Sequence, residues 1–281
     1  KLRGQYADQA VEMRNSMQPA IIYEDEDIIV CKKPAGVATQ TRRIGQADME
    51  SLLKNYRASK GELPYIGVVH RLDQPVEGIM VFAKNKEAAA DLSRQIKTKL
   101  ADKYYYAMTD GVPEKKKGTL EDELLQNGKT NTSEVVERGT PQAKHASLSY
   151  EVVEQDGKHA VLRIKLDTGR HHQIRVQLAH AGMPIVGDKK YNFKENIAPS
   201  GGQLALCSFK IAFRHPKTHK KLEFEIMSMI PFGMIGYMKL TFGDFLKVLY
   251  GNPAGIIVMS ICLALYFTAY IWGRKMIKIE V

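Results

Sequence analysis

The chain has 281 residues, of which 44% are hydrophobic and 26% are charged, so it is long and apolar enough to bury a full globular core. Its three widely separated cysteines, Cys31, Cys207 and Cys262, exclude a disulfide framework and a cysteine metal site, and they suit a reducing cytosol. A formal net charge of +10 and a pI near 9.3 favour a polyanionic partner, either nucleic acid or an anionic membrane.

Residues 1–16 are polar and lack the apolar centre of a secretory signal, so we interpret them as a poorly ordered extension before a domain that starts at Met17. The apolar runs then predict, in chain order, a hairpin of strands over 21–23 and 28–30, a helix over 48–58, a strand over 79–83, a helix over 86–100, and strands over 104–108, 146–153, 160–166, 204–213 and 222–224. Because strands outnumber helices and mostly follow one another as in hairpins, the predicted fold class is α+β with a mainly antiparallel sheet.

Two of these segments are predicted in more detail. The helix over 86–100 is amphipathic, with one apolar face formed by Ala89, Leu92, Ile96 and Leu100. The stretch 113–141 is polar and rich in lysine and asparagine, which favours a long loop or an insertion.

From residue 226 onward the composition changes. The stretch 254–273 contains no charged residue over about 20 positions, the length that a bilayer core requires, and Arg274 and Lys275 follow it directly. A shorter apolar stretch, 226–238, precedes it. A buried core helix is the alternative for the longer stretch, and an interfacial segment is the alternative for the shorter one. We therefore expect a membrane-associated tail over 226–281.

Three polar residues, His70, Arg71 and Asp73, lie between apolar runs at 68–69 and 79–83. An ionisable group between buried strands is desolvated, and it requires either a partner or a function. The structural alternative is an ion pair with Arg71 or a turn cap. A kinase-type His-Arg-Asp loop is excluded, because an extra leucine changes the spacing and no Gly-rich loop or Asp-Phe-Gly accompanies it.

A helix is predicted after the turn at Thr168-Gly169, with Thr168 as its N-cap and a buried stripe of Ile174, Leu178 and Ala181.

Arg170 and Arg175 lie off this stripe and can reach a carboxylate or a phosphate, although they also suit a plain surface helix. The two histidines between them are adjacent, and neighbouring helical residues point about 100° apart and rarely share a metal. His215 and His219 have a metal-like spacing but no second pair of ligands. We therefore expect no metal site.

Five segments, in order along the chain, resemble the RluA-type pseudouridine synthases: IIYEDEDIIVCKKPAGV (21–37), HRLDQPVEGIMVFAKN (70–85), KYYYAMTDG (103–111), LDTGRHHQIRVQLAHAGMPIVGDKKY (166–191) and LALCSFKIAFRHP (204–216). The resemblance covers residues 18–225, and it implies a catalytic domain over 17–225 with a mainly antiparallel mixed sheet and a central catalytic cleft.

On this resemblance Asp73 corresponds to the catalytic aspartate of the family, Tyr105 to its active-site tyrosine, and Arg175 to the arginine that pairs with the aspartate. The residues implied to contact the substrate are His70, Arg71, Leu72, Arg170, His172 and Gln173. The departures from the commonest pattern, at 75–77, His171 and Gln177, are interpreted as subfamily variation that alters the choice of RNA and leaves the chemistry intact.

The implied reaction isomerises specific uridines of structured RNA, ribosomal or transfer, to pseudouridine. The N1–C1′ bond breaks, the uracil turns, and C5 joins C1′, so no redox cofactor, nucleotide or metal is implied. An ionised Asp73 would act as nucleophile at the sugar or as base toward C2′. Arg175 would keep it ionised, and Tyr105 would stack on the target base and could move a proton. The target nucleotide must be flipped out of its stack, and the enzyme is expected to be a monomer.

The tail resembles the C-terminal end of the F-type inner-membrane platform proteins of type II secretion and Tad pilus systems, most clearly in its closing RKMIKIEV. We expect two spans, 226–238 and 254–273, that tether a cytoplasmic enzyme domain to the inner membrane with both termini cytoplasmic. A fused gene accounts equally well for this combination. The alternative function is a membrane component of such a system whose soluble domain binds RNA without catalysis, and the intact triad argues against it.

Overall fold

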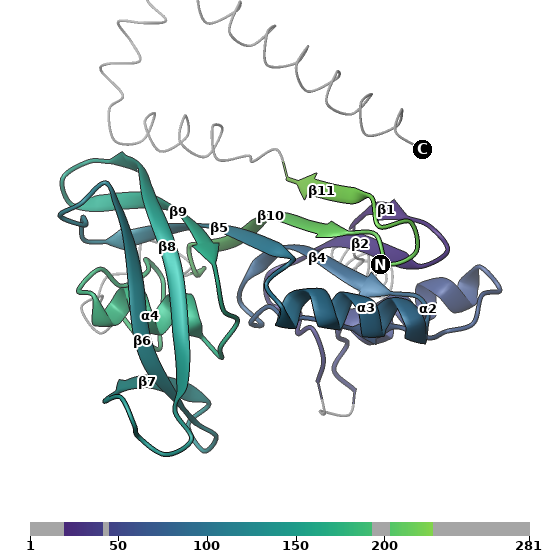
Figure 1. Cartoon of the computed structure of the whole chain (residues 1–281), viewed down its shortest axis with the longest axis horizontal. Coiled ribbons are helices and arrows are strands. Elements are labelled where there is room, and N and C mark those ends of the chain that lie inside the picture. The colour runs from purple at the N-terminus through teal and green to yellow at the C-terminus, as the bar shows by residue number, and fades with distance from the viewer. Residues whose placement is uncertain (1–19, 42–44, 193–202, 227–281) are drawn as a thin grey trace, which may run out of the picture. The chain divides into compact units, whose positions relative to one another are not determined.

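The structure is a computed structural model, and it describes residues 20–41, 45–192 and 203–226 (Figure 1). In this part of the chain one sheet of eleven strands is accompanied by the helices α2 (Met49–Ser59), α3 (Lys86–Lys97) and α4 (Gln173–His180). The strands are β1 (Ala20–Glu24), β2 (Ile28–Lys33), β3 (Gly67–Val68), β4 (Glu77–Ala83), β5 (Asp102–Asp110), β6 (Lys117–Asn127), β7 (Thr132–Val136), β8 (Lys144–Gln155), β9 (His159–Leu166), β10 (Leu206–Arg214) and β11 (Lys221–Glu225).

The order of the strands across the sheet is β1-β2-β4-β10-β5-β9-β8-β6-β7, with β11 paired to β10 and β3 to β4. Neighbouring strands in the described sheet are antiparallel except β4 and β10, which pair in parallel. The predicted α+β class with a mixed, mainly antiparallel sheet is therefore confirmed. The last long strand, β10, inserts between β4 and β5 and joins the two halves of the domain.

Strands β2 and β4 are buried on both faces, and successive residues contribute to two different cores. Ile29 and Met80 belong to the core that includes Met49 and Leu53 of α2. Their chain neighbours Ile28 and Ile79 belong to a second core, which α3 covers with Ala88 and Leu92. Alternation along a strand sends consecutive side chains to opposite faces, so these apolar runs require a layer on each side.

Polar side chains fix the ends of the first two described helices, as their sequences indicate. Asp48 accepts the N–H of Ser51 at 2.8 Å, and the hydroxyl of Ser51 accepts the N–H of Asp48 at 3.1 Å, which completes a capping box for α2. Asn85 caps α3 by accepting the N–H of Ala88 at 2.8 Å.

The loop predicted over 113–141 is wrong. This stretch contains β6 and β7, which pair as an antiparallel hairpin. On its other side β6 pairs with β8. The hairpin lies at the edge of the sheet, and along most of β6 neither face is fully buried; only Leu124 is part of a core. Its polar composition therefore resembles that of a loop, and backbone pairing rather than apolar burial defines it.

The predicted end of the helix over 86–100 is also wrong. The helix α3 ends at Lys97, Lys99 adopts a left-handed φ of 59°, and Leu100 is 61% exposed rather than part of the apolar face. Ala89 and Ile96 do pack against the second core. A left-handed residue after the last turn is a common helix ending, and it turns Leu100 away from the sheet.

The predicted N-cap of the following helix is wrong as well. The N-cap of α4 is His172, without a side-chain cap, and Thr168 instead donates to the side chain of Gln173. Ala181 is the exposed C-cap and not part of a buried stripe. All six residues from Gln173 to Leu178 are buried, so no single apolar stripe describes α4.

No helix among the described residues is long and apolar enough to cross a membrane. The expected extension over 1–16 lies outside the described residues. The expected spans over 226–238 and 254–273 also lie outside them, except for Ile226, which follows β11.

Gly78 lies where β4 meets β10, opposite Ser208, and its φ is +139°. A Cβ atom there would lie 2.2 Å from the carbonyl oxygen of Ser208. We expect Gly78→Ala to lower the free energy of unfolding by about 3 kcal/mol or more, because backbone atoms must separate and the φ is strained. The matched control is Gly128→Ala, whose Cβ would meet nothing within 4 Å. Denaturant unfolding of both variants measures the difference, and equal effects would contradict this packing argument.

Candidate active site

Asp73 lies in a tight turn that leads into β4. The N–H of Val76 donates to the carbonyl oxygen of Asp73 at 3.0 Å. The preceding Leu72 is buried, and its N–H and C=O both bond to the hydroxyl of Thr39, at 3.1 and 3.0 Å. The turn is therefore pinned to the core by its backbone, while the carboxylate of Asp73 remains 26% exposed.

Lys33, the last residue of β2, supports the same turn from inside. Its side chain is fully buried, and its ammonium group donates to the carbonyl oxygens of Val37 at 2.6 Å, Pro34 at 2.9 Å and Gln74 at 3.1 Å. Burial lowers the pKa of Lys33 to about 8, and the charge of Asp73 opposes this shift. Lys33 thus ties the end of β2 to the residue that follows Asp73.

Arg175 of α4 is buried and contacts two carboxylates. Its Nε and Nη2 atoms bond to Asp188 at 2.8 and 2.7 Å, a bidentate pair, and its Nη1 atom bonds to Asp73 at 3.3 Å. Burial opposes the charge of the guanidinium, but the bonds to Asp188 and the charge of Asp73 outweigh burial and raise the pKa of Arg175. The side chain of Asp188 is 0% exposed, so this carboxylate locks the guanidinium in place. Arg175 therefore presents one fixed N–H edge to the carboxylate of Asp73.

His172 lies beside the same carboxylate, with Nε2 3.7 Å from Oδ2 of Asp73. Burial, followed by the charges of Arg175 and of other neighbours, lowers the pKa of His172 to about 2, so the ring is neutral at neutral pH. Its Nδ1 lies 2.8 Å from the hydroxyl of Tyr191. The backbone of His172 is left-handed, at φ 52° and ψ 24°, a strained conformation for a residue other than glycine.

Tyr105 projects from β5 into the core next to Asp73 and is only 5% exposed. Burial first, and then the charge of Asp73, raises the pKa of Tyr105, while a hydrogen bond with Ser208 opposes the shift. The phenol is therefore neutral at physiological pH. Its position is consistent with a proton donor or a packing surface at the cleft floor.

Arg71 and His70, the first residues of the His-Arg-Leu-Asp motif, point to different surroundings. Arg71 is exposed and donates to the side chain of Gln40 at 2.9 Å. His70 accepts the N–H of Val81 on β4 at 3.1 Å, and burial lowers the pKa of His70 to about 3. The structure thus places His70 against the sheet, and a role for it toward the substrate stays a prediction.

Gln173 and Arg170 both contact the backbone of β8. Gln173 is buried; it donates to the carbonyl oxygen of Ser147 at 3.0 Å and accepts the N–H of Arg170 at 2.9 Å. The side chain of Arg170 is exposed, and its Nε atom donates to the carbonyl oxygen of His145 at 2.9 Å. Gln173 therefore anchors the start of α4, whereas Arg170 lies on the surface.

Comparisons with known proteins show the family of this chain. The family model described as RNA pseudouridylate synthase matches residues 27–180, more than half of the chain. The chain belongs to the RNA pseudouridylate synthase family. The ribosomal large subunit pseudouridine synthase D of Vibrio cholerae is 35% identical over 219 residues, which are 73% of this chain and 65% of that protein. The dual-specificity RNA pseudouridine synthase RluA of Vibrio parahaemolyticus is 34% identical over 204 residues, which are 71% of this chain and 79% of that protein.

The fold is that of solved pseudouridylate synthase domains. The structure titled Human RNA Pseudouridylate Synthase Domain Containing 4 matches with a TM-score of 0.63 at 21% identity, and the match covers 79% of this chain and 92% of that one. The chain spans about 65% of the length of the Vibrio cholerae relative. The predicted membership of the RluA-type synthases is thus confirmed for the enzyme domain, whereas no comparison supports the resemblance of the tail to secretion proteins.

Sequence reasoning missed three members of this pseudouridylate synthase site: Asp188, Tyr191 and Lys33. Asp188 and Tyr191 lie in the quoted segment 166–191, and Lys33 lies in the segment 21–37. Their signal was their presence in segments typical of the family, but only the tertiary structure shows that Asp188, and not Asp73, is the bidentate partner of Arg175.

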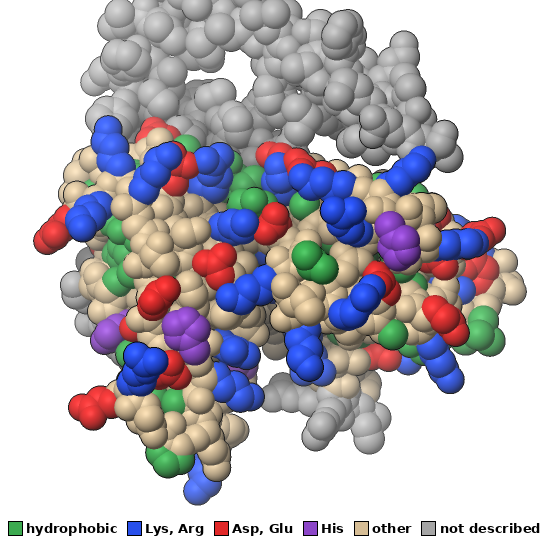
Figure 2. Space-filling model, in the orientation of Figure 1, with side chains coloured by type: hydrophobic (Ala, Val, Ile, Leu, Met, Phe, Trp, Pro, Cys, Tyr) green, Lys and Arg blue, Asp and Glu red, His purple; other side chains and the backbone are tan. Residues whose placement is uncertain are grey.

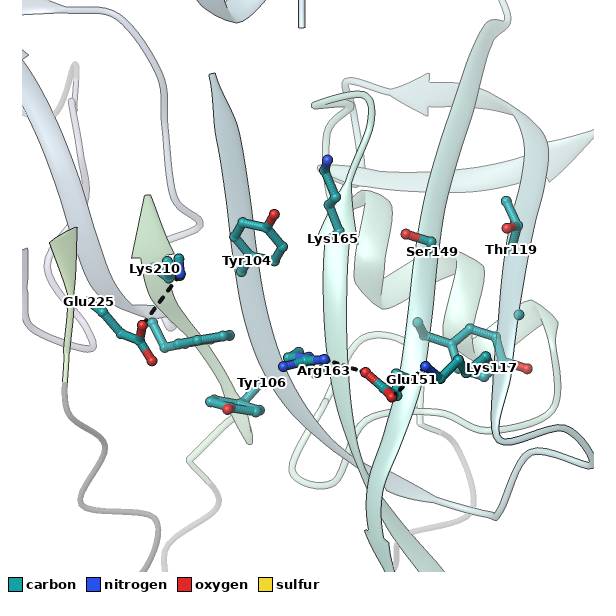
Figure 3. Close-up of a pocket in the computed structure, with 13 residues that line it drawn as sticks. Tyr104, Tyr106, Lys117, Thr119, Ser149, Glu151, Arg163, Lys165, Lys210 and Glu225 are labelled. Carbon is teal, nitrogen blue, oxygen red and sulfur yellow. Dashed lines mark hydrogen bonds and ion pairs between the residues drawn. The ribbon is translucent and has the colours of Figure 1, made fainter. Parts of the chain in front are cut away.

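A hollow of about 690 Å³ lies on the other face of the sheet from Tyr105 and is lined by Tyr104 and Tyr106, its neighbours on β5 (Figure 3). The cations around this hollow are already paired: Lys117 and Arg163 with Glu151, Lys165 with Asp102, and Lys210 with Glu223 and Glu225. Cross-strand ion pairs of this kind stabilise a solvated sheet face. Asp73 does not line this hollow.

Asp25, Asp27 and His215 have ligand atoms within 4.8 Å of one another, a cluster that sequence spacing did not predict. Both ring nitrogens of His215 are occupied by protein groups. Nε2 lies 2.9 Å from the carboxylate of Asp25, and Nδ1 accepts the N–H groups of Lys217 and Thr218, each at 3.1 Å. The cluster thus joins two turns through hydrogen bonds among protein atoms.

Proposed function

We propose that this chain converts uridine in RNA to pseudouridine, with Asp73 as the catalytic carboxylate. The observation that carries the proposal is the arrangement of Asp73 itself. Its backbone is pinned to the core through Leu72, its carboxylate contacts the buried guanidinium of Arg175 at 3.3 Å, and the carboxylate is still 26% exposed. A carboxylate that is fixed in place, paired with a buried cation and open to solvent is suited to attack on a substrate.

The reaction breaks the bond between N1 of uracil and C1′ of the ribose and forms a bond between C5 and C1′. The hydrogen on C5 is released as a proton and N1 takes up a proton, so the product has the same elemental composition as the substrate. Asp73 acts either as nucleophile at C1′ or as base toward C2′, and its ionised form is required in both routes. Arg175 pairs with the carboxylate of Asp73. Tyr105 supports the uracil ring or moves a proton from its neutral phenol.

The substrate we propose is ribosomal or transfer RNA, the classes that the names of the relatives suggest. A small hollow of about 250 Å³ adjoins the turn of Asp73 and is lined by Arg71, Gln40 and Gln74 among others, which offers polar contacts to the RNA beside the flipped base. Basic and acidic side chains are intermixed on the face shown in Figure 2. On this face the lysine and arginine side chains available to phosphates are therefore spread out and form no single basic patch.

The activity is tested with purified full-length protein and unmodified transcripts of ribosomal and transfer RNA that carry tritium at C5 of uridine. Isomerisation at a specific site releases one tritium per converted uridine to solvent, and sequencing of the treated transcript locates the product. We expect release that saturates at a small number of sites per transcript. No release from either class of transcript would contradict the proposed function.

We further propose that residues 226–281 associate with the inner membrane while the enzyme domain faces the cytoplasm. Support comes from the uncharged stretch 254–273 and the basic residues that follow it. We expect the full chain to sediment with membranes, and a chain of residues 17–225 to be soluble and active, because β11 ends at Glu225. Cell fractionation and the tritium assay measure both properties. An insoluble or inactive shorter chain would show that the tail belongs to the fold of the enzyme.

A further inference from the structure

The β6–β7 hairpin is bound to the start of α4 by several polar contacts. The hydroxyl of Ser133, on β7, lies 2.9 Å from Nδ1 of His171 and 2.9 Å from the carbonyl oxygen of the same residue. Nε2 of His171 lies 3.1 Å from the side chain of Asn131 in the hairpin turn, and Lys190 donates to the carbonyl oxygen of Asn131 at 2.6 Å. The hairpin is thus docked beside the residue that precedes His172.

A second set of contacts continues from the hairpin to the catalytic carboxylate. The N–H of Ser133 donates to the hydroxyl of Tyr191 at 2.7 Å, and that hydroxyl lies 2.8 Å from Nδ1 of His172. Nε2 of His172 lies 3.7 Å from Asp73. The edge strand of the sheet and Asp73 are therefore connected through two side chains.

The direction of these hydrogen bonds follows from their donors. Within the described residues, Ser133 and His172 are the hydrogen-bond partners of the Tyr191 hydroxyl. Because the hydroxyl already accepts a hydrogen bond from the N–H of Ser133, it satisfies both contacts by donating a hydrogen bond to Nδ1 of His172. Burial raises the pKa of Tyr191, so the phenol keeps that proton. The neutral imidazole of His172 then carries its single proton on Nε2, the nitrogen that lies near Asp73.

Two further features fix the ring of His172 in this place. The ring of His171 stacks on it at a centroid distance of 3.8 Å, and the ring of Tyr191 meets it edge-on at 5.6 Å. The left-handed backbone of His172, at φ 52°, costs energy and is maintained only where surrounding contacts determine it.

We propose that the docked β6–β7 hairpin, acting through Tyr191 and His172, fixes the imidazole tautomer beside Asp73 and so sets the reactivity of that carboxylate. Tyr191 and His172 are positioning residues in this proposal. It rests on the proposed function, since it assumes that Asp73 is the catalytic carboxylate. At 3.7 Å the Nε2–H group acts as a nearby dipole, and such contacts commonly shorten when the substrate binds.

The surroundings of Asp73 come from every element packed around it. These groups are Arg175, His171 and His172 at α4, Lys33 at the end of β2, Tyr105 on β5, and Tyr191. Nη1 of Arg175 donates to the carboxylate at 3.3 Å, and Nε2 of His172 faces it at 3.7 Å. Loss of the Nε2–H removes one of these two donors, so the reaction at Asp73 should slow.

Two substitutions in the full-length protein test the relay. His172→Asn removes the atom near Asp73 but retains an acceptor close to the Nδ1 position, and asparagine tolerates the left-handed backbone. Tyr191→Phe keeps the ring against His172 and removes the hydroxyl that fixes the tautomer. For each variant we expect a roughly tenfold lower single-turnover rate on tritiated transcripts. RNA affinity should be unchanged, and the double variant should be no worse than the worse single variant.

Tyr106→Phe is the matched control, because Tyr106 stacks on Phe209 at 4.0 Å on the opposite face of β5. It should leave the rate unchanged. Nitrogen-15 shifts of the imidazole of His172 give a readout that does not depend on activity. We expect the Nε2–H tautomer to dominate in the wild type, and a larger share of the Nδ1–H tautomer in Tyr191→Phe.

An unchanged rate, an unchanged tautomer in Tyr191→Phe, or weaker RNA binding as the sole effect would overturn the relay and assign His172 to packing or RNA contact. If the wild type is active and Asp73→Asn is inactive while the rate and the tautomer do not change in Tyr191→Phe, only the relay fails. If Asp73→Asn remains active, the proposed function itself fails.

Discussion

Replacing Asp73 with asparagine is expected to abolish pseudouridine formation while leaving RNA affinity largely intact. The substitution keeps the size of the side chain and its exposed position in the turn, and it removes the charge that both routes of the reaction require. Catalysis should fall by at least about four orders of magnitude, the scale at which loss of a nucleophile is usually measured. Single-turnover tritium release measures the rate, and filter binding of the same transcript measures the affinity.

The matched control for this variant is Asp102→Asn. Asp102 also forms an ion pair, with Lys165 at 2.9 Å, and its side chain is 36% exposed, but it lies at the start of β5 away from the cleft. This control should retain the wild-type rate. Near wild-type conversion by Asp73→Asn would contradict the assignment of the catalytic carboxylate.

Replacing Arg175 with methionine is expected to damage both activity and stability. Activity falls because the carboxylate of Asp73 loses the guanidinium that donates to it at 3.3 Å. Stability falls because the carboxylate of Asp188, which is 0% exposed, loses its bidentate partner. Removal of one member of a buried pair costs about 3–5 kcal/mol. Denaturant unfolding and single-turnover tritium release measure the two effects separately.

The double variant Arg175→Met with Asp188→Asn distinguishes the two roles. Asparagine removes the unpaired charge but can still accept the N–H groups of Lys190 and Tyr191, which bond to Asp188 at 2.9 and 3.3 Å. The double variant should therefore regain much of the stability and none of the lost activity. Unaltered activity and stability in Arg175→Met would show that the guanidinium does not act on Asp73.

Much of the sheet could be predicted from the sequence because its central strands are buried on both faces. Apolar runs such as 28–30 and 79–83 have few other stable arrangements. The β6–β7 hairpin escaped prediction because it lies at the edge, where pairing is made by the backbone and the side chains are mostly polar. The end of α3 escaped prediction because a left-handed residue, Lys99, interrupts a periodic pattern that continues to Leu100.

The candidate site was predictable only in part, and for a related reason. Asp73 and Arg175 correspond to residues of a known family, and the structure brings them to 3.3 Å although they are 102 positions apart in the chain. The contacts of Asp188 and Tyr191 depend on how the segment after α4 folds back against that helix, which no local pattern encodes. A sequence can therefore indicate the reacting groups, whereas the groups that hold them in place are found from the structure.

The most direct test of the central claim is a map of pseudouridines in total RNA from cells with the gene, without it, and with the deletion complemented by wild type or by Asp73→Asn. We expect one site or a few sites in ribosomal or transfer RNA to lose pseudouridine on deletion, to regain it with the wild-type gene, and to stay unmodified with Asp73→Asn. An identical map in all four strains, or restoration by Asp73→Asn, would contradict the claim that this chain isomerises uridine through Asp73.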